Sequence, residues 1–144
     1  MLLGTAGLVE GECFLLDQGV DLVIGRSRSC DISLRRTTAY LKTPPAARDS
    51  DHDFNTVSRR HLRILINDAS ASLQDLSTNG TFCNGEPLHD LLKVDLDNGA
   101  CTIRLGTRET FQLCLLERSD PRLKDIQPVS VAAAAAKADD QGAD

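Results

Sequence analysis

The chain has 144 residues, of which 41% are hydrophobic, and a formal net charge of −5. This size suits one folded domain that builds its core without help from a metal or a disulfide. The sequence has no apolar run near the roughly 20 residues of a membrane span and no basic leader, so neither a membrane protein nor an exported one is expected. Its five cysteines contain no C-x-x-C pair, which favours reduced thiols in a cytoplasmic protein over a metal site.

Apolar runs of strand length follow one another along the chain. They cover residues 12–17, 21–25, 31–34, 61–67, 71–76, 81–85, 100–106 and 110–117. In 61–67, Leu62, Ile64 and Ile66 alternate with polar or charged neighbours such as Arg63 and Asn67, as in a half-buried strand. Turn-forming stretches such as STNG and DNG separate the runs. The pattern predicts an all-β protein, either an antiparallel β-sandwich or a barrel.

Two segments interrupt this rhythm. Residues 35–56 are long, polar and divided by prolines, and loops of this kind tend to be functional or disordered. After about residue 118 the chain loses its large apolar groups and becomes rich in alanine and acidic residues. We therefore predict one domain over residues 1–118, with an insert at 35–56, followed by a flexible C-terminal tail at 119–144.

The charge is unevenly distributed. Residues 26–63 hold nine Lys or Arg against four Asp, whereas the chain as a whole is acidic. Such a local positive segment concentrates negatively charged ligands. A nucleic-acid ligand is disfavoured because the net charge is −5 and the chain has a single Tyr and no Trp for stacking on bases.

The sequence SRRH places Ser58 three residues before His61, which raises the possibility of a nucleophile and its base. In an extended segment these two positions point to opposite faces, and no nucleophile-elbow motif accompanies them. His52 and His89 show no metal-ligand spacing, and no phosphate-binding loop of the nucleotide-hydrolysing type is present. We therefore predict a protein that is not an enzyme and uses no metal or cofactor, with His61 in a structural role.

Three separate segments instead carry donors that suit a compact anion. Arg26 follows Gly25 at the end of an apolar run, and a guanidinium can hold phosphate oxygens through two donors. Ser58 offers a hydroxyl next to Arg59, and the turn 77–81 offers hydroxyl, amide and backbone donors.

The ordered set GRSRSCDI (25–32), SRRH (58–61) and DLSTNGTFCNG (75–85) resembles the forkhead-associated (FHA) domain. The resemblance spans roughly residues 10–118. It implies a β-sandwich of the FHA/SMAD-like type, with about eleven strands, whose loops at one end bind a phosphothreonine peptide.

Carried over by position, the resemblance implies that Arg26 and Ser58 bind the phosphate and that Arg59 is an additional contact. It implies that Asn79 binds the peptide backbone and that Thr78 supports the pocket. Residues with an architectural role in the site would be Gly25, His61, Gly80, Asn84 and Gly85.

The predicted function is therefore phosphothreonine-dependent protein binding in Ser/Thr kinase signalling. The partner would be a phosphothreonine-containing protein or peptide, such as a Ser/Thr kinase or its substrate, and neither a nucleic acid nor a membrane. Two alternatives stay open at this stage. One is a phosphate-independent scaffold or assembly domain on the same fold, and the other is a nucleic-acid binder that uses residues 26–63.

Overall fold

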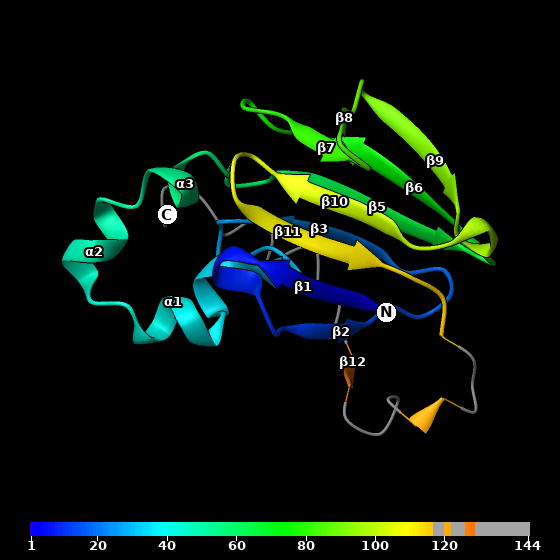
Figure 1. The fold of residues 1–144 in the computed structure, drawn as a ribbon, viewed down its shortest axis with the longest axis horizontal. Coiled ribbons are helices and arrows are strands. Elements are labelled where there is room, and N and C mark those ends of the chain that lie inside the picture. Colours follow the sequence, from blue (N-terminus) through cyan, green and yellow to red (C-terminus); the bar gives the residue numbers. More distant parts are fainter. Residues whose placement is uncertain (117–119, 122–125, 129–144) are drawn as a thin grey trace.

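The computed structural model describes residues 1–116, 120–121 and 126–128, and within them the chain forms two β-sheets that face each other (Figure 1). The seven-stranded sheet has the order β12-β2-β1-β11-β10-β7-β8. Its strands are β1 (Leu2–Ala6), β2 (Cys13–Leu15), β7 (Thr81–Cys83), β8 (Glu86–Pro87), β10 (Cys101–Leu105), β11 (Glu109–Leu113) and β12 (Gln127–Pro128). The second sheet has five strands in the order β4-β3-β5-β6-β9.

The five-stranded sheet consists of β3 (Asp21–Gly25), β4 (Ile32–Ser33), β5 (Leu62–Asn67), β6 (Ser70–Asp75) and β9 (Leu91–Asp95). Pairing is antiparallel except for β3 with β4 and β12 with β2, which are parallel. The predicted all-β sandwich is thus confirmed, with twelve strands among the described residues.

The core lies between the sheets and follows from side-chain alternation. Along β5, Leu62, Ile64 and Ile66 are buried while the residues between them are exposed. On the facing sheet, Ile103 of β10 and Phe111 of β11 are fully buried. Because successive side chains of a strand point to opposite faces, each sheet turns one apolar face inward.

Some strands have weak sequence signals and were not predicted. β1 contains the small residues Gly4 and Ala6, and its conformation depends on its pairing with β11, which is distant in sequence. β9 is mostly exposed and pairs with β6 as an edge strand. In both cases partners distant in sequence decide the conformation, because strand preference depends strongly on packing context.

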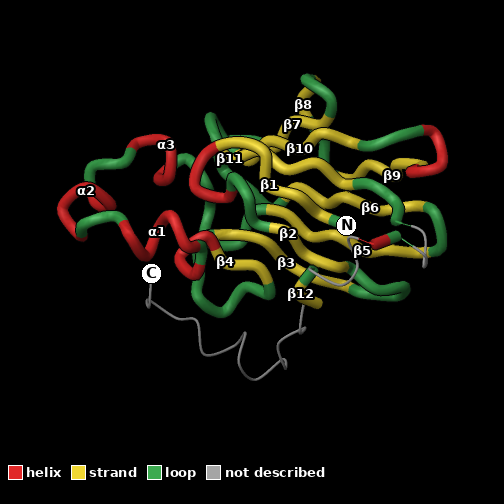
Figure 2. The backbone as a smooth tube through the Cα atoms, turned by 60° about the horizontal axis from the view of Figure 1, so that its bottom comes forward, coloured by secondary structure: helices red, strands yellow, loops and turns green. Residues whose placement is uncertain are grey.

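The predicted insert is ordered rather than an extended loop. It contains a 3₁₀ turn, η2 (Leu34–Arg36), and three short helices, α1 (Thr38–Lys42), α2 (Pro45–Asp49) and α3 (His52–Asn55). The side chain of Thr37 caps α1 and that of Asp51 caps α3, and Pro45 begins α2, which are favourable residues for helix starts. Figures 1 and 2 show the helices together at one end of the sandwich.

The insert is fixed to the domain by aromatic side chains. Tyr40 and Phe54 are buried, join the core, and stack with their ring centroids 5.2 Å apart. Burial of two aromatic rings supplies a large apolar contact area, which explains why this polar segment adopts one conformation.

Two further predictions concern cysteines and the tail. All five cysteines are described, and none is joined in a disulfide; Cys30, Cys83 and Cys101 are buried. Within the predicted tail, β12 pairs with β2 and Ile126 is buried. Residues 129–144 lie outside the described residues, so the flexible tail and the boundary at 118 stay predictions.

Among the described residues, no helix has the length and apolar character needed to cross a membrane.

Candidate functional site

The segments that carry the predicted site residues meet at the end of the sandwich that also carries the insert. The turn after β3 contains Arg26, the segment before β5 contains Ser58, and the loop between β6 and β7 contains Thr78 and Asn79. Hydrogen bonds join the segment of Ser58 to the turn of Arg26 and to the loop of Thr78 and Asn79. The structure thus brings together residues that are far apart in sequence.

Arg26 lies where β3 leaves the sheet. Its backbone N–H donates to the carbonyl of Ser58 at 3.1 Å, and its Nε–H donates to the carbonyl of Val57. The guanidinium carbon also lies 5.8 Å from the ring centroid of Phe54, within the range of a cation–π contact. These contacts fix the direction of a guanidinium that is still partly exposed.

Gly25 permits this close approach. A Cβ at Gly25 would lie 2.1 Å from the carbonyl oxygen of Arg59, a distance that side chains do not tolerate. The glycine lets the two backbones meet, so that Ser27 N–H also donates to that oxygen at 3.0 Å. Gly25 is therefore architectural through steric fit rather than through an unusual backbone angle.

Ser58 and His61 do not form a catalytic pair. The backbone N–H of Ser58 donates to Nδ1 of His61 at 3.0 Å, and the hydroxyl of Ser58 instead accepts from Thr78 N–H at 3.0 Å. Nε2 of His61 lies 2.9 Å from the carbonyl of Gly80. Since Nδ1 accepts, the proton must be on Nε2, and the imidazole is neutral.

The environment of His61 agrees with that assignment. The side chain is fully buried, and burial lowers the pKa of His61 below its usual value despite the opposing effects of Gly80 and the Asp75 charge. Both ring nitrogens are used to hold backbone groups. His61 therefore connects the segment of Ser58 to the loop of Gly80.

Asp75, which the sequence reasoning did not single out, organises the loop between β6 and β7. Its Oδ1 accepts from the Ser77 N–H at 3.0 Å, the Ser77 hydroxyl at 2.5 Å and the Thr81 hydroxyl at 3.0 Å. Ser77 Oγ in turn accepts from Gly80 N–H at 2.9 Å. This network shapes the turn that presents Thr78 and Asn79, both of which are exposed.

Asn79 also joins the segments. Its Nδ2 donates to the carbonyl of Thr56 at 3.1 Å. Arg59, predicted as an additional contact, is exposed beside Ser58. Segments that carry a guanidinium, a hydroxyl and a side-chain amide are thus joined to one another at this end of the sandwich, and this combination of donors suits an anion with several acceptor oxygens.

Comparison with known proteins settles the family. The family model of the FHA domain matches residues 22–106, which is more than half of the chain. The chain belongs to the FHA family. A comparison with curated proteins gave no match.

Solved FHA domains share the fold. One, from a structural and functional analysis of phosphothreonine-dependent FHA domain interactions, is 28% identical, with a TM-score of 0.56 over 81% of this chain and 96% of that chain. The FHA domain of FhaA, in complex with the intracellular domain of Rv3910, is 26% identical, with a TM-score of 0.52 over 78% and 100%. An FHA domain from Arabidopsis thaliana is 24% identical, with a TM-score of 0.59 over 83% and 87%, and supports the fold alone.

Not every predicted supporting residue of this FHA domain touches the site. Gly80 has a φ of +101° and belongs to the loop between β6 and β7. Asn84 and Gly85 instead form the turn from β7 to β8, at the other end of β7, with φ of 51° and 84°. This pair of left-handed residues is typical of a type I′ hairpin. The Asn84 side chain accepts from Thr102 N–H at 2.9 Å, so it holds the turn from β7 to β8 against β10.

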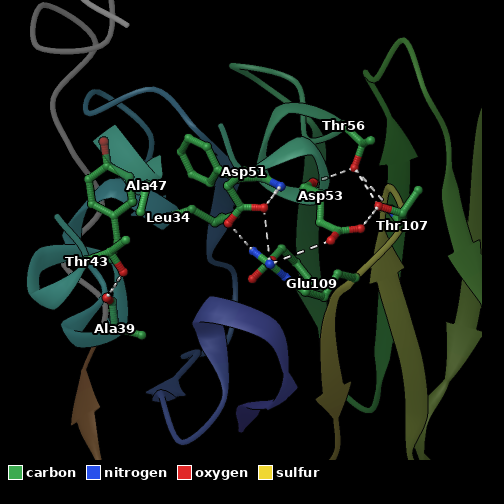
Figure 3. A network of polar contacts seen from close by, with 12 residues as sticks. Leu34, Ala39, Thr43, Ala47, Asp51, Asp53, Thr56, Thr107 and Glu109 are labelled. Atoms are coloured by element: carbon green, nitrogen blue, oxygen red, sulfur yellow. Dashed lines mark hydrogen bonds and ion pairs between the residues drawn. The ribbon is translucent and has the colours of Figure 1, made fainter. Parts of the chain in front are cut away.

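The insert of this FHA domain is connected to the site by a polar network (Figure 3). The hydroxyl of Thr56 donates to Asp53 O at 2.6 Å and accepts from Thr107 N–H at 3.1 Å. The Thr107 hydroxyl donates to the carboxylate of Asp53 at 2.7 Å. These contacts fasten the end of α3 to the turn between β10 and β11, and thereby fix the backbone that receives Asn79.

Arg108 completes that network. It forms a two-pronged contact with Asp51, at 3.2 and 2.8 Å, and a 2.7 Å contact with the fully buried Glu109. Burial alone would raise the pKa of Asp51, but Arg108 and the N–H of Phe54 outweigh it and lower that pKa. For Glu109 burial is dominant and raises the pKa. No sequence motif marked these residues, because their pairing depends on the tertiary fold.

Proposed function

We propose that this FHA domain binds phosphothreonine-containing proteins or peptides, with the phosphate held by Arg26 and Ser58. Thr78 and Asn79 contact the peptide beside it, and Arg59 adds a further contact. The observation that carries the proposal is the hydrogen-bonded convergence of three segments, each of which contributes one type of anion donor. The related domain of 28% identity, studied for phosphothreonine-dependent interactions, supports it.

The chemistry of the ligand fits these donors. A phosphate ester carries about −1.5 to −2 charges and three acceptor oxygens. In the proposed complex, the terminal amino groups of Arg26, rather than the Nε that donates to the carbonyl of Val57, meet two of the oxygens. The Ser58 hydroxyl already accepts from Thr78 N–H, so its own hydrogen can be donated to a third oxygen.

The protein acts by binding rather than by catalysis. Both nitrogens of His61 are engaged with backbone groups, and Ser58 Oγ has no base in these contacts. The proposed context of such a reversible phosphate-dependent contact is Ser/Thr kinase signalling. Its partner would be a Ser/Thr kinase or a substrate of one.

The test is a binding titration with matched peptides. One peptide sequence is prepared with phosphothreonine, phosphoserine or unmodified threonine, and the dissociation constants are measured by calorimetry. We expect the phosphothreonine form to bind most tightly, the phosphoserine form to bind about fivefold more weakly because one methyl group contributes about 1 kcal/mol, and the unmodified peptide not to bind.

Variants locate the phosphate. Arg26→Ala should weaken binding by about 10- to 100-fold, as expected for charge-assisted hydrogen bonds. Arg26→Lys should recover only part of the loss, since lysine lacks the planar fork. Arg63→Ala is the matched control, because Arg63 is exposed on β5, paired with Asp21 and outside the site. Equal binding of the three peptides would refute the proposal and favour a phosphate-independent scaffold.

A further inference from the structure

Two cysteine side chains meet on the inner face of the seven-stranded sheet. Cys83 is the last residue of β7, and Cys101 is the first residue of β10, the strand that pairs with β7. Cys83 lies opposite Ile103, so Cys101 is its diagonal neighbour and shares its face of the sheet. The two sulfur atoms are 2.8 Å apart, although the residues are 18 positions apart in the sequence.

This separation is close to that of a covalent bond. The sulfur atoms of a disulfide are about 2.05 Å apart, so a movement of less than about 1 Å would bring Cys83 and Cys101 to bonding distance. The fold therefore holds two nucleophilic side chains in position to react with each other, and neither side chain belongs to the proposed phosphate site.

Burial gives the two thiols different properties. Cys83 is 7% exposed and Cys101 is 3% exposed, and both belong to the hydrophobic core. Burial, together with the contact with Cys83, raises the pKa of Cys101 to about 12. Cys101 consequently keeps its proton at neutral pH, and Cys83 is the sulfur that meets an oxidant from outside.

Access to the pair is through a thin part of the sheet. The strand beside β7 is β8, which is at the edge of the sheet and has only two residues, Glu86 and Pro87, both exposed (Figure 1). A short edge strand opens locally at a lower free energy than a central strand. An oxidant of about the size of a water molecule can therefore reach Cys83 without global unfolding.

We propose that Cys83 and Cys101 form a redox-sensitive site, at which hydrogen peroxide converts the two thiols to a reversible disulfide between β7 and β10. This inference goes beyond the proposed function and does not depend on it.

The reaction balances in two steps. The thiolate of Cys83 attacks one peroxide oxygen, the O–O bond breaks, and the leaving hydroxide takes up a proton to form water, which leaves Cys83 as a sulfenic acid. The sulfur of Cys101 then attacks the sulfur of Cys83, the S–O bond breaks, and the hydroxide leaves with the Cys101 proton as a second water. Two thiols thus lose two electrons and two protons, and one peroxide is reduced to two waters. The contact between the sulfur atoms makes the second step fast compared with further oxidation of the sulfenic acid.

The new bond should stabilise the domain. It ties β7 to β10 and closes the segment 83–101 into a loop, which restricts the unfolded chain more than the folded one. We expect the oxidised protein to have a thermal unfolding midpoint about 5–10 °C above that of the reduced protein.

The test is a disulfide map of the wild-type protein. Trypsin cleaves after Lys93 and Arg104, so Cys83 and Cys101 are on the separate peptides 64–93 and 94–104, and no other cysteine is on either peptide. The folded protein is treated with hydrogen peroxide, its remaining thiols are blocked with N-ethylmaleimide, and the digest is analysed by mass spectrometry without reductant. We expect the joined peptides 64–93 and 94–104 as the main disulfide, the loss of two of the five thiols, and recovery of both with dithiothreitol.

Two single variants locate the reaction. Cys101→Ala should abolish both the joined peptide and the thermal shift, and Cys83 should then accumulate as a sulfenic acid that dimedone traps. Cys114→Ala is the matched control, because Cys114 is a half-buried cysteine that directly follows β11. This control should retain the joined peptide and the thermal shift.

Three results on the wild-type protein would overturn the proposal, so it stays testable even if Cys101→Ala does not fold. The first is the absence of the joined peptide in folded protein whose half-buried Cys13 and Cys114 are oxidised. The second is an equal yield of the joined peptide from protein oxidised in urea, since pairing should then be spread over several combinations of cysteines. The third is an oxidised protein that unfolds at a lower temperature than the reduced one, since the bond would then require displaced strands.

Discussion

Replacement of His61 by alanine removes one of the connections between two of the three site segments. The imidazole is fully buried and makes two hydrogen bonds, with Ser58 N–H at 3.0 Å and with the Gly80 carbonyl at 2.9 Å. Gly80 O keeps a second donor, Gly106 N–H at 3.0 Å, whereas Ser58 N–H loses this acceptor. The loss of the imidazole should therefore cost more free energy at Ser58 N–H than at the Gly80 carbonyl.

The magnitude follows from these contacts. Loss of the Gly80 contact costs about 1 kcal/mol, and leaving Ser58 N–H without its acceptor costs about 1–2 kcal/mol. Removal of a buried ring adds about 1–2 kcal/mol for the cavity. We expect His61→Ala to lower the free energy of unfolding by about 3–5 kcal/mol, measured by urea denaturation followed by circular dichroism. Phosphothreonine-peptide affinity should also fall about tenfold, because Ser58 loses its anchor, although His61 itself touches no ligand.

The pH dependence gives an independent check. In the unfolded chain His61 takes up a proton near its ordinary pKa of 6.5, whereas the buried imidazole has a lowered pKa. Below pH 6.5 the unfolded state therefore binds more protons, and wild-type stability falls by up to about 1.4 kcal/mol per pH unit until the lowered pKa is reached. His61→Ala lacks this contribution, so the stability difference between the two proteins should shrink as the pH falls from 7.5 to 5.5.

His61→Asn is the matched control, because its side-chain oxygen can accept from Ser58 N–H without reaching Gly80, and it should recover about half of the lost stability. A loss below about 1 kcal/mol in His61→Ala would refute the assigned structural role. A stability difference that grows toward low pH would refute the neutral, Nε2-protonated assignment.

Two further predictions concern the backbone approach and the insert. Gly25→Ala should lower the free energy of unfolding by about 3 kcal/mol and weaken peptide binding, since its Cβ would lie 2.1 Å from Arg59 O. In the control Gly19→Ala the added Cβ would meet nothing within 4 Å, so this variant should lose only about 1 kcal/mol. Equal losses of the two variants in urea denaturation would contradict the steric argument. Asp51→Asn should cost about 1 kcal/mol at pH 7 through the lost pairing with Arg108, while the cap on Phe54 N–H is retained. Because the pKa of Asp51 is lowered, the stabilisation that Asp51 provides is present above the ordinary value of 3.8 and is lost as the pH falls through the lowered pKa. A difference in the free energy of unfolding between wild type and Asp51→Asn that persists at pH 2 would contradict this pairing.

The sequence alone determined the fold class and the candidate site residues. Apolar alternation such as that of Leu62, Ile64 and Ile66 is a local property, so it predicted β5 and the sandwich directly. The site residues stand in short motifs whose order along the chain resembles one family. Arg26, Ser58 and Asn79 could therefore be proposed as site residues before any contact between their segments was known.

Only the tertiary structure decided which segments meet and how they are held. β1 and β9 depend on pairing with distant strands, and the insert is ordered by burial of Tyr40 and Phe54 against the core. The pairing of Asp51 with Arg108 and the hydrogen bond from Asn79 to the Thr56 carbonyl likewise join groups that are distant in sequence. Contacts between residues distant in sequence form only when the whole core is assembled, and local periodicity holds no information about them.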